Sequence, residues 1–445
     1  MTDPSTAFPL PPRQRIAVIG AGIAGHGAAW ALAKDHEVTL YEAADYFGGH
    51  SDTAEVSGAN GQPINIDMGF IVYNTHNYPE LTALFETLGV ATEASNMSFG
   101  VSMDGGGFEY CGSGIKGVLA QPLNALRPRF LRMLFDLKRF YQTAAIDLMG
   151  ADQEDVPLGE TLKTLGYSES FIDDHIVPMA AAIWSAPASQ ILAFPTASFV
   201  RFFDNHRLFL FKGRPQWRTV TGGSRSYVEA LHQDGHFRAF HSAPVEAVVR
   251  EENGVLVKLA TSEERYDHVI IATHADQALK LLATPTAPER SLLSQFDYST
   301  NQTYLHTDAS VMPKRRAVWS AWNYVERDAK ERENPDAPVP VSYWMNRLQN
   351  ISGPIDYFVT LNPQTPIPED KVLRTRQYSH PIFDGKAIRA QRDLGMLATD
   401  PLISFCGSNF GYGFHEDALR SGLNVARRLG AVLPWEASKT KRAAA

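Results

Sequence analysis

A glycine-rich turn near the start of the chain, flanked by short apolar runs, most constrains how this chain can fold. The first apolar run, 16–19, leads into three glycines with the spacing G-x-G-x-x-G: Gly20, Gly22 and Gly25. An alanine-rich stretch at 28–34 predicts a helix, and a second apolar run at 38–41 is followed at once by Glu42. A strand, a tight turn, a helix and a strand that ends on an acid are typical of a dinucleotide-binding unit, and an ordinary βα turn is the alternative.

Each residue type in this unit has a physical reason. Gly20 permits the tight turn, Gly22 lets the backbone approach a pyrophosphate, and Gly25 lets the helix pack closely on the strand. The N-terminus of the helix then faces the phosphates, and Glu42 accepts hydrogen bonds from a ribose hydroxyl. The residues predicted to bind the dinucleotide here are Gly20, Gly22, Ile23, Ala24, Gly25, Glu42 and Ala43.

Composition limits the kind of protein that carries this unit. A chain of 445 residues is too long for one simple core, so two domains are expected. The formal net charge of −8 argues against nucleic-acid binding, and none is predicted. Cys111 and Cys406 cannot form a disulfide framework or a cysteine-based zinc site, which fits a reducing cytoplasm, and no metal is predicted. The sequence shows no secretory signal and no apolar stretch of about 18 residues, so a cytoplasmic location is expected.

A second glycine pair follows closely after Glu42. Gly48 and Gly49 let a loop pass tightly under a cofactor's pyrophosphate or ribityl chain, and a plain turn is the alternative. Because the pair comes directly after the acid of a dinucleotide unit, it favours FAD over NAD. Together with the first turn it resembles the N-terminal signature of the FAD-containing amine oxidase and phytoene desaturase superfamily. That superfamily usually has Arg after the pair, where this chain has His50.

The stretch 403–429 resembles the superfamily's second cofactor motif. A strand is expected to end at Gly407, and a glycine-rich loop that includes Gly413 leads into a helix. The free N–H groups at the start of this helix can bind the flavin O2 edge. Superfamily members usually carry an acid after the first glycine, where this chain has Ser408. Cys406 lies within the strand, the wrong place for a covalent link, so non-covalent FAD is expected.

The same resemblance suggests residues near the flavin and the substrate. Phe414 matches one position of the aromatic pair that flanks the substrate in amine oxidases, and His415 is the candidate acid or base beside the flavin. The alternative for His415 is that only its backbone contributes. The remaining cofactor-binding residues that the resemblance implies are Met68, Gly69 and Phe70, from a segment passing near the flavin, and Val245, whose backbone contacts the adenine.

Residues 112–200 change character and predict a helical cap. The stretch 130–148 places Phe130, Leu134, Leu137 and Tyr141 on one helical face. Residues 116–139 carry six basic side chains against one acid: Lys116, Arg127, Arg129, Arg132, Lys138, Arg139 and Asp136. Such a segment can lie on an anionic membrane surface, which would place the protein at the inner face of the membrane. The alternative is a solvated cap helix whose apolar face lies in the core.

Residues 280–395 read mostly as strands. Runs that alternate apolar with polar residues and carry many aromatics predict an antiparallel sheet along one wall of the substrate site. His306 and Asp308 suggest a proton relay, so His306 is a third catalytic candidate beside Phe414 and His415. Cross-strand pairs within a half-buried sheet are the alternative.

The resemblance covers about residues 14–430 and implies an α/β protein, α+β overall. A Rossmann-type FAD-binding domain is expected to interleave with a substrate domain of antiparallel sheet plus helical cap. The expected FAD-binding segments are 14–95, 215–278 and 396–435. The expected substrate segments are 96–214 and 279–395, with flexible tails at 1–13 and 436–445.

Segments such as GGHS, AAIWS and GYGFHEDAL are similar to one bacterial branch of this superfamily. Its members are predicted NAD/FAD-binding proteins that often occur beside cyclopropane-fatty-acid-synthase-like methyltransferases. The branch and the aromatic cap together imply an FAD-dependent oxidoreductase or desaturase of lipid metabolism, acting on an apolar, acyl-chain-like substrate. Two alternatives stay open: an amine or amino-acid oxidase that releases peroxide, and an FAD-binding accessory partner of a lipid methyltransferase.

Overall fold

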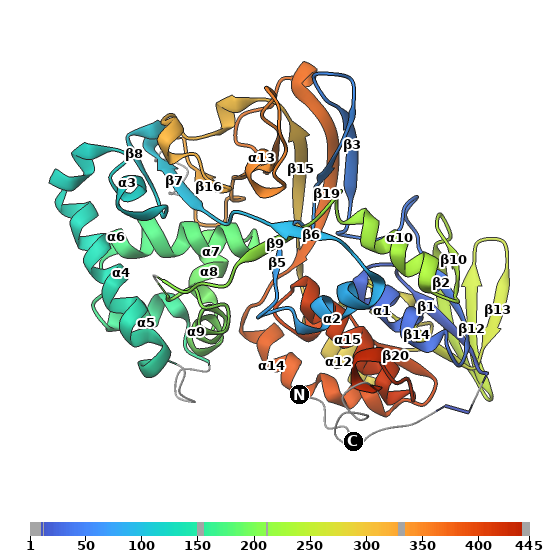
Figure 1. Ribbon diagram of the computed structural model, residues 1–445. Coiled ribbons are helices and arrows are strands. Elements are labelled where there is room, and N and C mark those ends of the chain that lie inside the picture. Colours follow the sequence, from blue (N-terminus) through green and yellow to red (C-terminus); the bar gives the residue numbers. More distant parts are fainter. Residues whose placement is uncertain (1–9, 12, 149–154, 211, 328–333, 438–445) are drawn as a thin grey trace, which may run out of the picture.

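A five-stranded parallel sheet forms the core of one lobe (Figure 1). The computed structural model describes residues 10–11, 13–148, 155–210, 212–327 and 334–437. In spatial order the strands are β10 (Arg238–Phe240), β2 (Glu37–Tyr41), β1 (Arg15–Ile19), β14 (His268–Ile271) and β20 (Ile403–Phe405). They come from widely separated parts of the chain, and each neighbouring pair is parallel.

Both faces of this sheet are buried, which explains why its strands are continuous apolar runs. Successive side chains of a strand point to opposite faces. Ile16 and Val18 therefore pack against α1 (Ile23–Leu32) and α15 (His415–Arg428). Ala17 and Ile19 pack against an antiparallel three-stranded sheet on the other face. Its strands are β11 (Val245–Glu251), β12 (Gly254–Leu259) and β13 (Glu263–Tyr266).

The two cofactor motifs meet where α1 crosses α15. A Cβ at Gly422 of α15 would overlap the carbonyl oxygen of Ala24 in α1, so the two backbones are in direct contact. A Cβ at Gly27 would lie 2.6 Å from Leu419. Glycines on both helices thus bring the turn after β1 and the loop before α15 to the same edge of the sheet.

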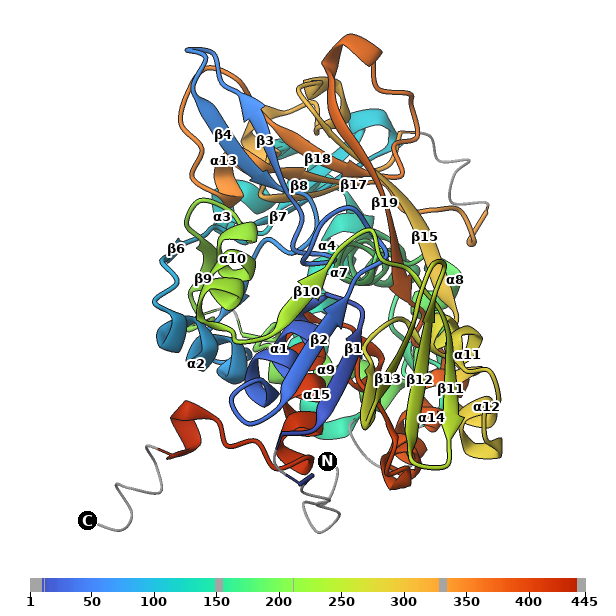
Figure 2. The same cartoon turned by 90° about the vertical axis from the view of Figure 1, so that its right-hand side faces the viewer.

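A seven-stranded sheet forms the second lobe. In spatial order its strands are β19 (Val372–Pro381), β15 (Tyr298–His306), β18 (Phe358–Leu361), β17 (Val341–Trp344), β16 (Trp322–Val325), β7 (Phe99–Met103) and β8 (Phe108–Cys111). The sheet is antiparallel as expected, except that β16 pairs with β7 in parallel. Figure 2 shows the two long strands β15 and β19 running from this lobe down beside the first.

The cap is helical and packs against the second sheet. Its helices are α3 (Gly114–Val118), α4 (Pro128–Asp147), α5 (Leu158–Thr164), α6 (Glu169–Phe171), α7 (Val177–Trp184), α8 (Ala188–Ala193) and α9 (Thr196–Asn205). Together with strands of the sheet, they enclose the largest hydrophobic cluster of the molecule. No helix in the described ranges is long and apolar enough to cross a membrane.

Shorter elements connect the two lobes. Two-residue to five-residue strands form small antiparallel sheets: β3 (Thr53–Ser57), β4 (Pro63–Asp67), β5 (Tyr73–Asn74), β6 (Thr92–Ala94) and β9 (Trp217–Val220). The remaining α-helices are α2 (Pro79–Leu88), α10 (Arg225–Asp234), α11 (Ala275–Leu281), α12 (Ala287–Leu293), α13 (Met345–Leu348) and α14 (Gly385–Asp393).

The expected flexible tails need correction where they border the fold. Leu10 N donates to Leu429 O at 3.2 Å, and Arg13 N donates to Asp35 O at 3.0 Å. Glu436 forms an ion pair with Arg427 at 2.7 Å. These contacts hold Leu10, Arg13 and Glu436 on the lobe of the parallel sheet, because backbone and charged groups both find partners there. Residues 1–9, 12 and 438–445 lie outside the described residues.

Candidate cofactor and active site

In the turn predicted to bind a pyrophosphate, two of the three glycines have no room for a side chain, and the third faces free space. Gly20 has a φ of +102°, and a Cβ there would lie 2.8 Å from the Ala272 carbonyl oxygen. A Cβ at Gly25 would overlap the Gly20 carbonyl oxygen, so α1 presses directly on the turn. A Cβ at Gly22, in contrast, would meet no described atom within 4 Å. The space beside Gly22 is therefore free for a ligand.

The N-terminus of α1 opens onto the same space. Gly22 is its N-cap, no side chain caps the helix, and its first turn contains no acid. The first N–H groups of a helix lack partners within it and carry partial positive charge, so they attract an anion. Ile23 and Ala24 bury their side chains and can contribute only these N–H groups. Gly49 borders the other side, since a Cβ there would lie 3.2 Å from the Gly22 Cα.

Glu42 is held beside this turn with acceptor capacity to spare. One carboxylate oxygen accepts from Ala21 N at 2.8 Å, and the other accepts from Ala44 N at 2.9 Å. A carboxylate offers about four acceptor positions, so ribose hydroxyls can still bind. Ala43 is exposed next to it. Gly48 N donates to Ala21 O at 2.9 Å, which joins the second glycine pair to the first turn.

The segment that leads into β11 pairs with the main chain of Glu42. Ala243 N donates to Glu42 O at 2.8 Å, two residues before Val245. The Val245 side chain is partly buried against the sheet. The adenosine half of the expected cofactor thus has a phosphate site, a ribose acceptor and a strand start in one row.

Three segments meet where the flavin half is expected. Phe70 N donates to His50 O at 2.6 Å, and a Cβ at Gly69 would overlap the same oxygen. The Phe70 ring stacks on His415 with centroids 3.8 Å apart. Met68 is buried in the large cluster beneath. Residues 50, 68–70 and 415, predicted from separate motifs, are therefore in contact.

The imidazole of His415 points into the lobe of the parallel sheet, which corrects its predicted role as acid or base. Its Nε2 lies 2.7 Å from the Tyr227 hydroxyl, and Tyr227 is fully buried. Burial lowers the pKa of His415 to about 3, so the ring is neutral near pH 7. The structure favours the alternative in which the side chain positions the helix start and only the backbone faces the cofactor.

The loop before α15 is held by hydrogen bonds within its own backbone and by the Ser421 hydroxyl. Gly413 has a φ of +91°, and a Cβ there would lie 2.8 Å from the Phe383 ring. Gly413 N donates to Ser408 O at 3.2 Å, and Gly407 N donates to the Ser421 hydroxyl at 2.9 Å. The tight path places Phe414 as the N-cap residue of α15.

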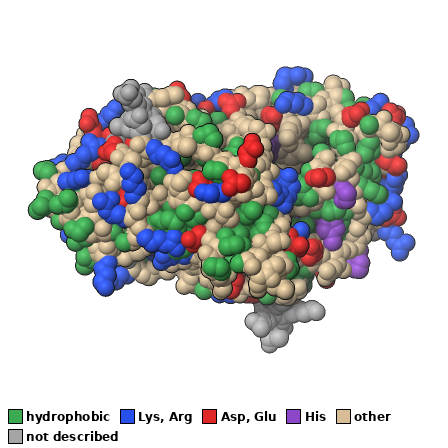
Figure 3. All heavy atoms as spheres, turned by 90° about the horizontal axis from the view of Figure 1, so that it is seen from above, with side chains coloured by type: hydrophobic (Ala, Val, Ile, Leu, Met, Phe, Trp, Pro, Cys, Tyr) green, Lys and Arg blue, Asp and Glu red, His purple; other side chains and the backbone are tan. Residues whose placement is uncertain are grey.

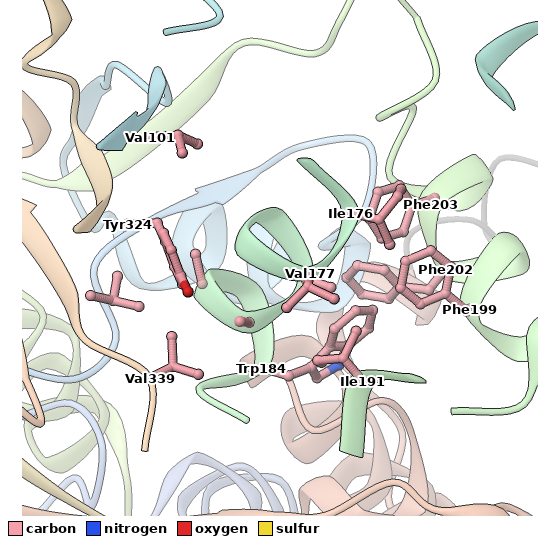
Figure 4. Packing of buried hydrophobic residues seen from close by; sticks show 14 of the residues in the cluster. Val101, Ile176, Val177, Trp184, Ile191, Phe199, Phe202, Phe203, Tyr324 and Val339 are labelled. Carbon is pink, nitrogen blue, oxygen red and sulfur yellow. The ribbon is translucent and has the colours of Figure 1, made fainter. Parts of the chain in front are cut away.

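Phe414 projects toward the cap rather than into its own lobe. Its ring stacks on Phe202 of α9 with centroids 5.0 Å apart, and His206 lies 5.7 Å away. Phe202 in turn lies 4.7 Å from Trp184 of α7. Figure 4 shows Trp184 and the phenylalanines of α9 converging in this part of the cluster. The aromatic position predicted to face the substrate therefore borders an aromatic wall of the cap.

A small apolar hollow, with about 10 Å³ of space for a water-sized group, lies next to this wall. Its lining residues are Trp184, Ala186, Gln190, Ile191, Phe194, Pro381, Ile382 and Phe383. Of these described residues none is charged. Trp184 Nε1 and Gln190 Oε1 are buried without a hydrogen-bond partner among the described residues. Since buried polar atoms are normally paired, the hollow offers one donor and one acceptor to a polar group that reaches it.

His306 does not belong to this site, which corrects the third catalytic prediction. It lies eight residues along β15 from Tyr298, about 26 Å at the usual rise of a strand. Tyr298 contacts the FAD-binding lobe, because its hydroxyl accepts from Ala275 N at 2.8 Å. His306 Nε2 lies 2.8 Å from the Thr360 hydroxyl, and Asp308 forms an ion pair with Lys371 at 2.9 Å. Both residues stabilise the far end of the sheet.

A histidine and an acid next to the predicted His50 segment, His380 and Asp52, show what the motifs missed. His380 of β19 lies 5.3 Å from His50, ring to ring. His50 Nε2 is buried without a hydrogen-bond partner among the described residues, and burial together with His380 lowers the pKa of His50. Asp52 pairs with Arg374 at 2.9 Å and with Arg376 at 2.8 Å. No local pattern marks His380 or Asp52, because only the tertiary fold brings β19 beside residues 50–52.

The orphaned nitrogen of His50 and the open space at Gly22 are where FAD requires donors. His50 would donate to the cofactor where superfamily members usually have Arg, while α1 would hold the pyrophosphate and Glu42 the ribose. The residues present therefore fit FAD. Cys406 is buried, and burial raises the pKa of its thiol to about 12, which disfavours the thiolate.

Comparison with known proteins agrees with this geometry. The family described as flavin-containing amine oxidoreductase matches residues 23–430. A protoporphyrinogen oxidase-like protein from Exiguobacterium sp. 255-15 is 17% identical, covering 93% of this chain and 98% of its own, with a TM-score of 0.66. A CLA-producing fatty acid isomerase from P. acnes is 16% identical, covering 95% and 100%, also with a TM-score of 0.66. Cyclohexylamine oxidase from Brevibacterium oxydans IH-35A is 15% identical, covering 94% and 99%, with a TM-score of 0.64.

These three structures share the fold of this chain, and the family match spans most of it. The matched range begins at Ile23, directly after the first two turn glycines, and contains Glu42, four of the five strands of the parallel sheet and the second motif. The chain therefore belongs to the family of flavin-containing amine oxidoreductases and is an enzyme of mixed α/β fold, an oxidoreductase that uses FAD.

Proposed function

We propose that the enzyme oxidises or desaturates an apolar substrate of the fatty-acyl or lipid type. The observation that carries this proposal is the aromatic wall of Phe414, Phe202 and Trp184, together with the small hollow beside Phe383, which is lined almost entirely by apolar side chains. An acyl chain matches such a lining because its burial releases water from apolar surface on both partners. One structure of the same fold is described as a fatty acid isomerase, so the fold is compatible with an acyl substrate.

The polar end of the substrate has two partners in the hollow. Trp184 Nε1 is a donor and Gln190 Oε1 an acceptor, and neither has a partner among the described residues. A carboxyl, ester or hydroxyl group would satisfy them. This leaves the hydrocarbon part free to extend toward Phe383, whose ring lies against Gly413 at the start of the second motif.

The protein must orient the substrate and exclude water from the reacting atoms. Bound FAD supplies a two-electron acceptor for a hydride from a substrate C–H bond. Phe414 and Phe202 form a stacked pair beside that position, so they exclude water and restrict the substrate. Loss of a hydride and a proton from neighbouring carbons leaves a double bond, and the proton passes to solvent. Burial lowers the pKa of His415 to about 3, so its imidazole is a poor acceptor for this proton.

An amine substrate is the main competing function. Cyclohexylamine oxidase and putrescine oxidase have the same fold. A protonated amine, however, is best held by a carboxylate, and the described residues that line the hollow include none. The second competitor is an accessory role for the flavoprotein beside a lipid methyltransferase, in which flavin turnover would be absent.

Anaerobic flavin bleaching distinguishes these functions. The FAD-loaded enzyme is mixed with saturated, unsaturated, methylated and cyclopropane-containing acyl lipids, and separately with apolar and charged amines. We expect bleaching at the flavin absorbance band with at least one acyl class. Bleaching by amines alone, with peroxide released in air, would make the protein an amine oxidase. Stable binding to a methyltransferase without bleaching by either panel would favour the accessory role.

Removing the unpaired donor tests the place of the substrate. Trp184→Phe is expected to raise KM for the active lipid about tenfold, the value of one hydrogen bond. Trp344→Phe is the matched control, because Trp344 Nε1 is already bonded to Asp356 at 2.8 Å in a separate cluster. Equal KM values in both variants would remove the hollow from the substrate path.

A further inference from the structure

An unusual number of large apolar side chains is exposed at one end of the cap. They come from α3, from the 3₁₀ turn Pro122–Leu126 and from the first half of α4. The members are Ile115 (80% exposed), Leu119 (39%), Leu123 (64%), Leu126 (79%), Leu131 (51%) and Phe135 (61%). We call these six residues, together with the six Lys and Arg side chains of residues 116–139, the α3–α4 surface. Isolated exposed leucines are ordinary, whereas a continuous group marks a surface that binds something.

This group is not the inner face of α4. The inner face buries Phe130, Met133, Phe140 and Tyr141 in the large cluster, and Leu134 and Leu137 pack at its edge. The apolar face predicted from the sequence is therefore the core face. Leu131 and Phe135, one helical turn apart, point to the opposite side. Packing within the fold therefore does not explain why these exposed side chains are apolar.

Basic residues accompany the exposed apolar ones. Residues 112–148 hold six Lys and Arg side chains against two acids, although the whole chain has a formal net charge of −8. Part of this charge is paired: Arg132 bonds the buried Asp136 at 3.1 Å, and Arg129 pairs with Asp174 at 2.8 Å and with Asp173 at 3.6 Å. Asp147 lies at the far end of α4. Lys116 and Lys138 are exposed. Figure 3 shows hydrophobic and basic side chains side by side at the cap end of the molecule.

We propose that the α3–α4 surface docks on the headgroup region of a lipid bilayer that contains anionic lipids. Leucine, isoleucine and phenylalanine side chains partition below the phosphates, and Lys and Arg side chains bind them. Positive charge on a chain of opposite net charge orients this end toward an anionic surface. The surface lies outside the cofactor site, so the proposal stands independently of the substrate class.

Vesicle binding of the FAD-loaded protein tests the proposal. The protein is sedimented with vesicles of phosphatidylcholine alone and of phosphatidylcholine with phosphatidylglycerol. We expect binding only to the anionic vesicles, weakening as salt is raised. Lys116→Gln with Lys138→Gln should lower the partition coefficient on the order of 30-fold, from the usual contribution of a basic residue near such a surface.

Apolar variants separate insertion from simple charge attraction. Leu123→Ser with Leu126→Ser should lower the partition coefficient at least about tenfold without changing the thermal midpoint, because both side chains are exposed in the free protein. Met396→Ser with Val432→Ser is the matched control, since those residues are 56% and 64% exposed away from the cap. A Trp placed at Leu126 should shift its fluorescence to shorter wavelength with anionic vesicles.

Three results would overturn the proposal. The first is absence of binding to anionic vesicles. The second is equal binding by the α3–α4 variants and the control. The third is concentration-dependent self-association that the Leu123 and Leu126 substitutions abolish in the absence of lipid, which would make this surface a contact between two copies of the chain.

Discussion

At the scale of single residues, the three glycines of the first turn do different work. Gly25 has no room for a side chain because its Cβ would overlap the Gly20 carbonyl oxygen, whereas Gly22 faces open space. The motif does not show this difference: Gly25 is required for packing of the fold, and Gly22 leaves space for the ligand. Substitution at each position should therefore affect different measurements.

Gly22→Ala is expected to leave the thermal midpoint of the apoprotein nearly unchanged and to weaken FAD binding by roughly tenfold or more, because the added methyl group occupies the phosphate space. Gly25→Ala should instead destabilise the apoprotein by about 2–3 kcal/mol, since backbone must move. FAD titration by fluorescence and thermal unfolding measure the two effects. Equal loss of stability in both variants would contradict the separation.

Asp67 gives the protein a defined pH dependence. It is fully buried, accepts from the Thr53 hydroxyl at 2.6 Å and from Ser224 N at 2.8 Å, and burial raises its pKa to about 6. A raised pKa in the folded state means that stability is greatest below about pH 4 for this group and is lost as pH rises through 6. Asp67 should therefore lower the free energy of unfolding by about 3 kcal/mol between pH 4 and 7.

Urea unfolding of the protein and of Asp67→Asn across this pH range measures the effect. The variant should show a shallower fall with pH, because the amide does not titrate. Glu416, whose pKa burial raises to about 7, leaves a remaining slope at the upper end of the range in both proteins. Parallel pH profiles in the two proteins would exclude Asp67 as a source.

At the scale of elements, acids of α15 hold two helix starts. Asp417 accepts from Tyr412 N at 3.0 Å and Phe414 N at 3.2 Å at the start of α15 itself. Glu416 accepts from Glu80 N at 2.9 Å and Leu81 N at 3.0 Å at the start of α2. Within the GYGFHEDAL motif, Asp417 thus fixes the loop before α15, and Glu416 fixes the start of the neighbouring helix α2.

Glu416→Ala is expected to reduce the free energy of unfolding by about 2 kcal/mol at pH 6, because two N–H groups at the start of α2 lose their acceptor. Glu229→Ala is the control: Glu229 is an exposed residue of α10 that pairs with exposed Arg225, and it should change stability by less than about 0.5 kcal/mol. Chemical denaturation measures both. An equal effect in the two variants would contradict the capping role.

At the scale of the whole molecule, FAD should act as a fold-stabilising ligand. The expected contacts come from segments that are far apart in the sequence: Gly22 and Glu42 next to the parallel sheet, Val245 in the antiparallel sheet packed on it, and the start of α15. A ligand that binds only the folded state stabilises by mass action, by about 2.7 kcal/mol at a free concentration 100 times its Kd. Thermal unfolding of apoprotein and FAD-loaded protein should show a midpoint that rises with FAD concentration.

The attachment of FAD can be tested on the same preparation. Cys406 is buried within the core of the FAD-binding lobe and its thiol has a raised pKa, so a thioether link is disfavoured. Acid precipitation should therefore leave the flavin absorbance in the supernatant. Flavin retained in the washed pellet would show a covalent bond to some residue of the chain.

The sequence by itself determined the two cofactor motifs, the Rossmann-type sheet and the helical cap. Glycine spacing, apolar runs and a terminal acid report on backbone geometry within a few residues, and such local requirements leave a readable pattern. The roles assigned to His415 and His306 show the limit. A histidine beside a cofactor motif suggests a catalytic role. The structure, however, turns the His415 imidazole toward Tyr227 and places His306 at the far end of β15.

Only the tertiary structure decided which side chains share a site. Trp184 and Phe383 come to one hollow from segments about 200 residues apart, and Asp52 meets Arg376 across a separation of 324. Strand register and helix crossing set these meetings, and neither leaves a trace in the local sequence. Likewise, α4 was readable as amphipathic, but packing alone decided that Phe130 and Tyr141 face the core while Leu131 and Phe135 face outward.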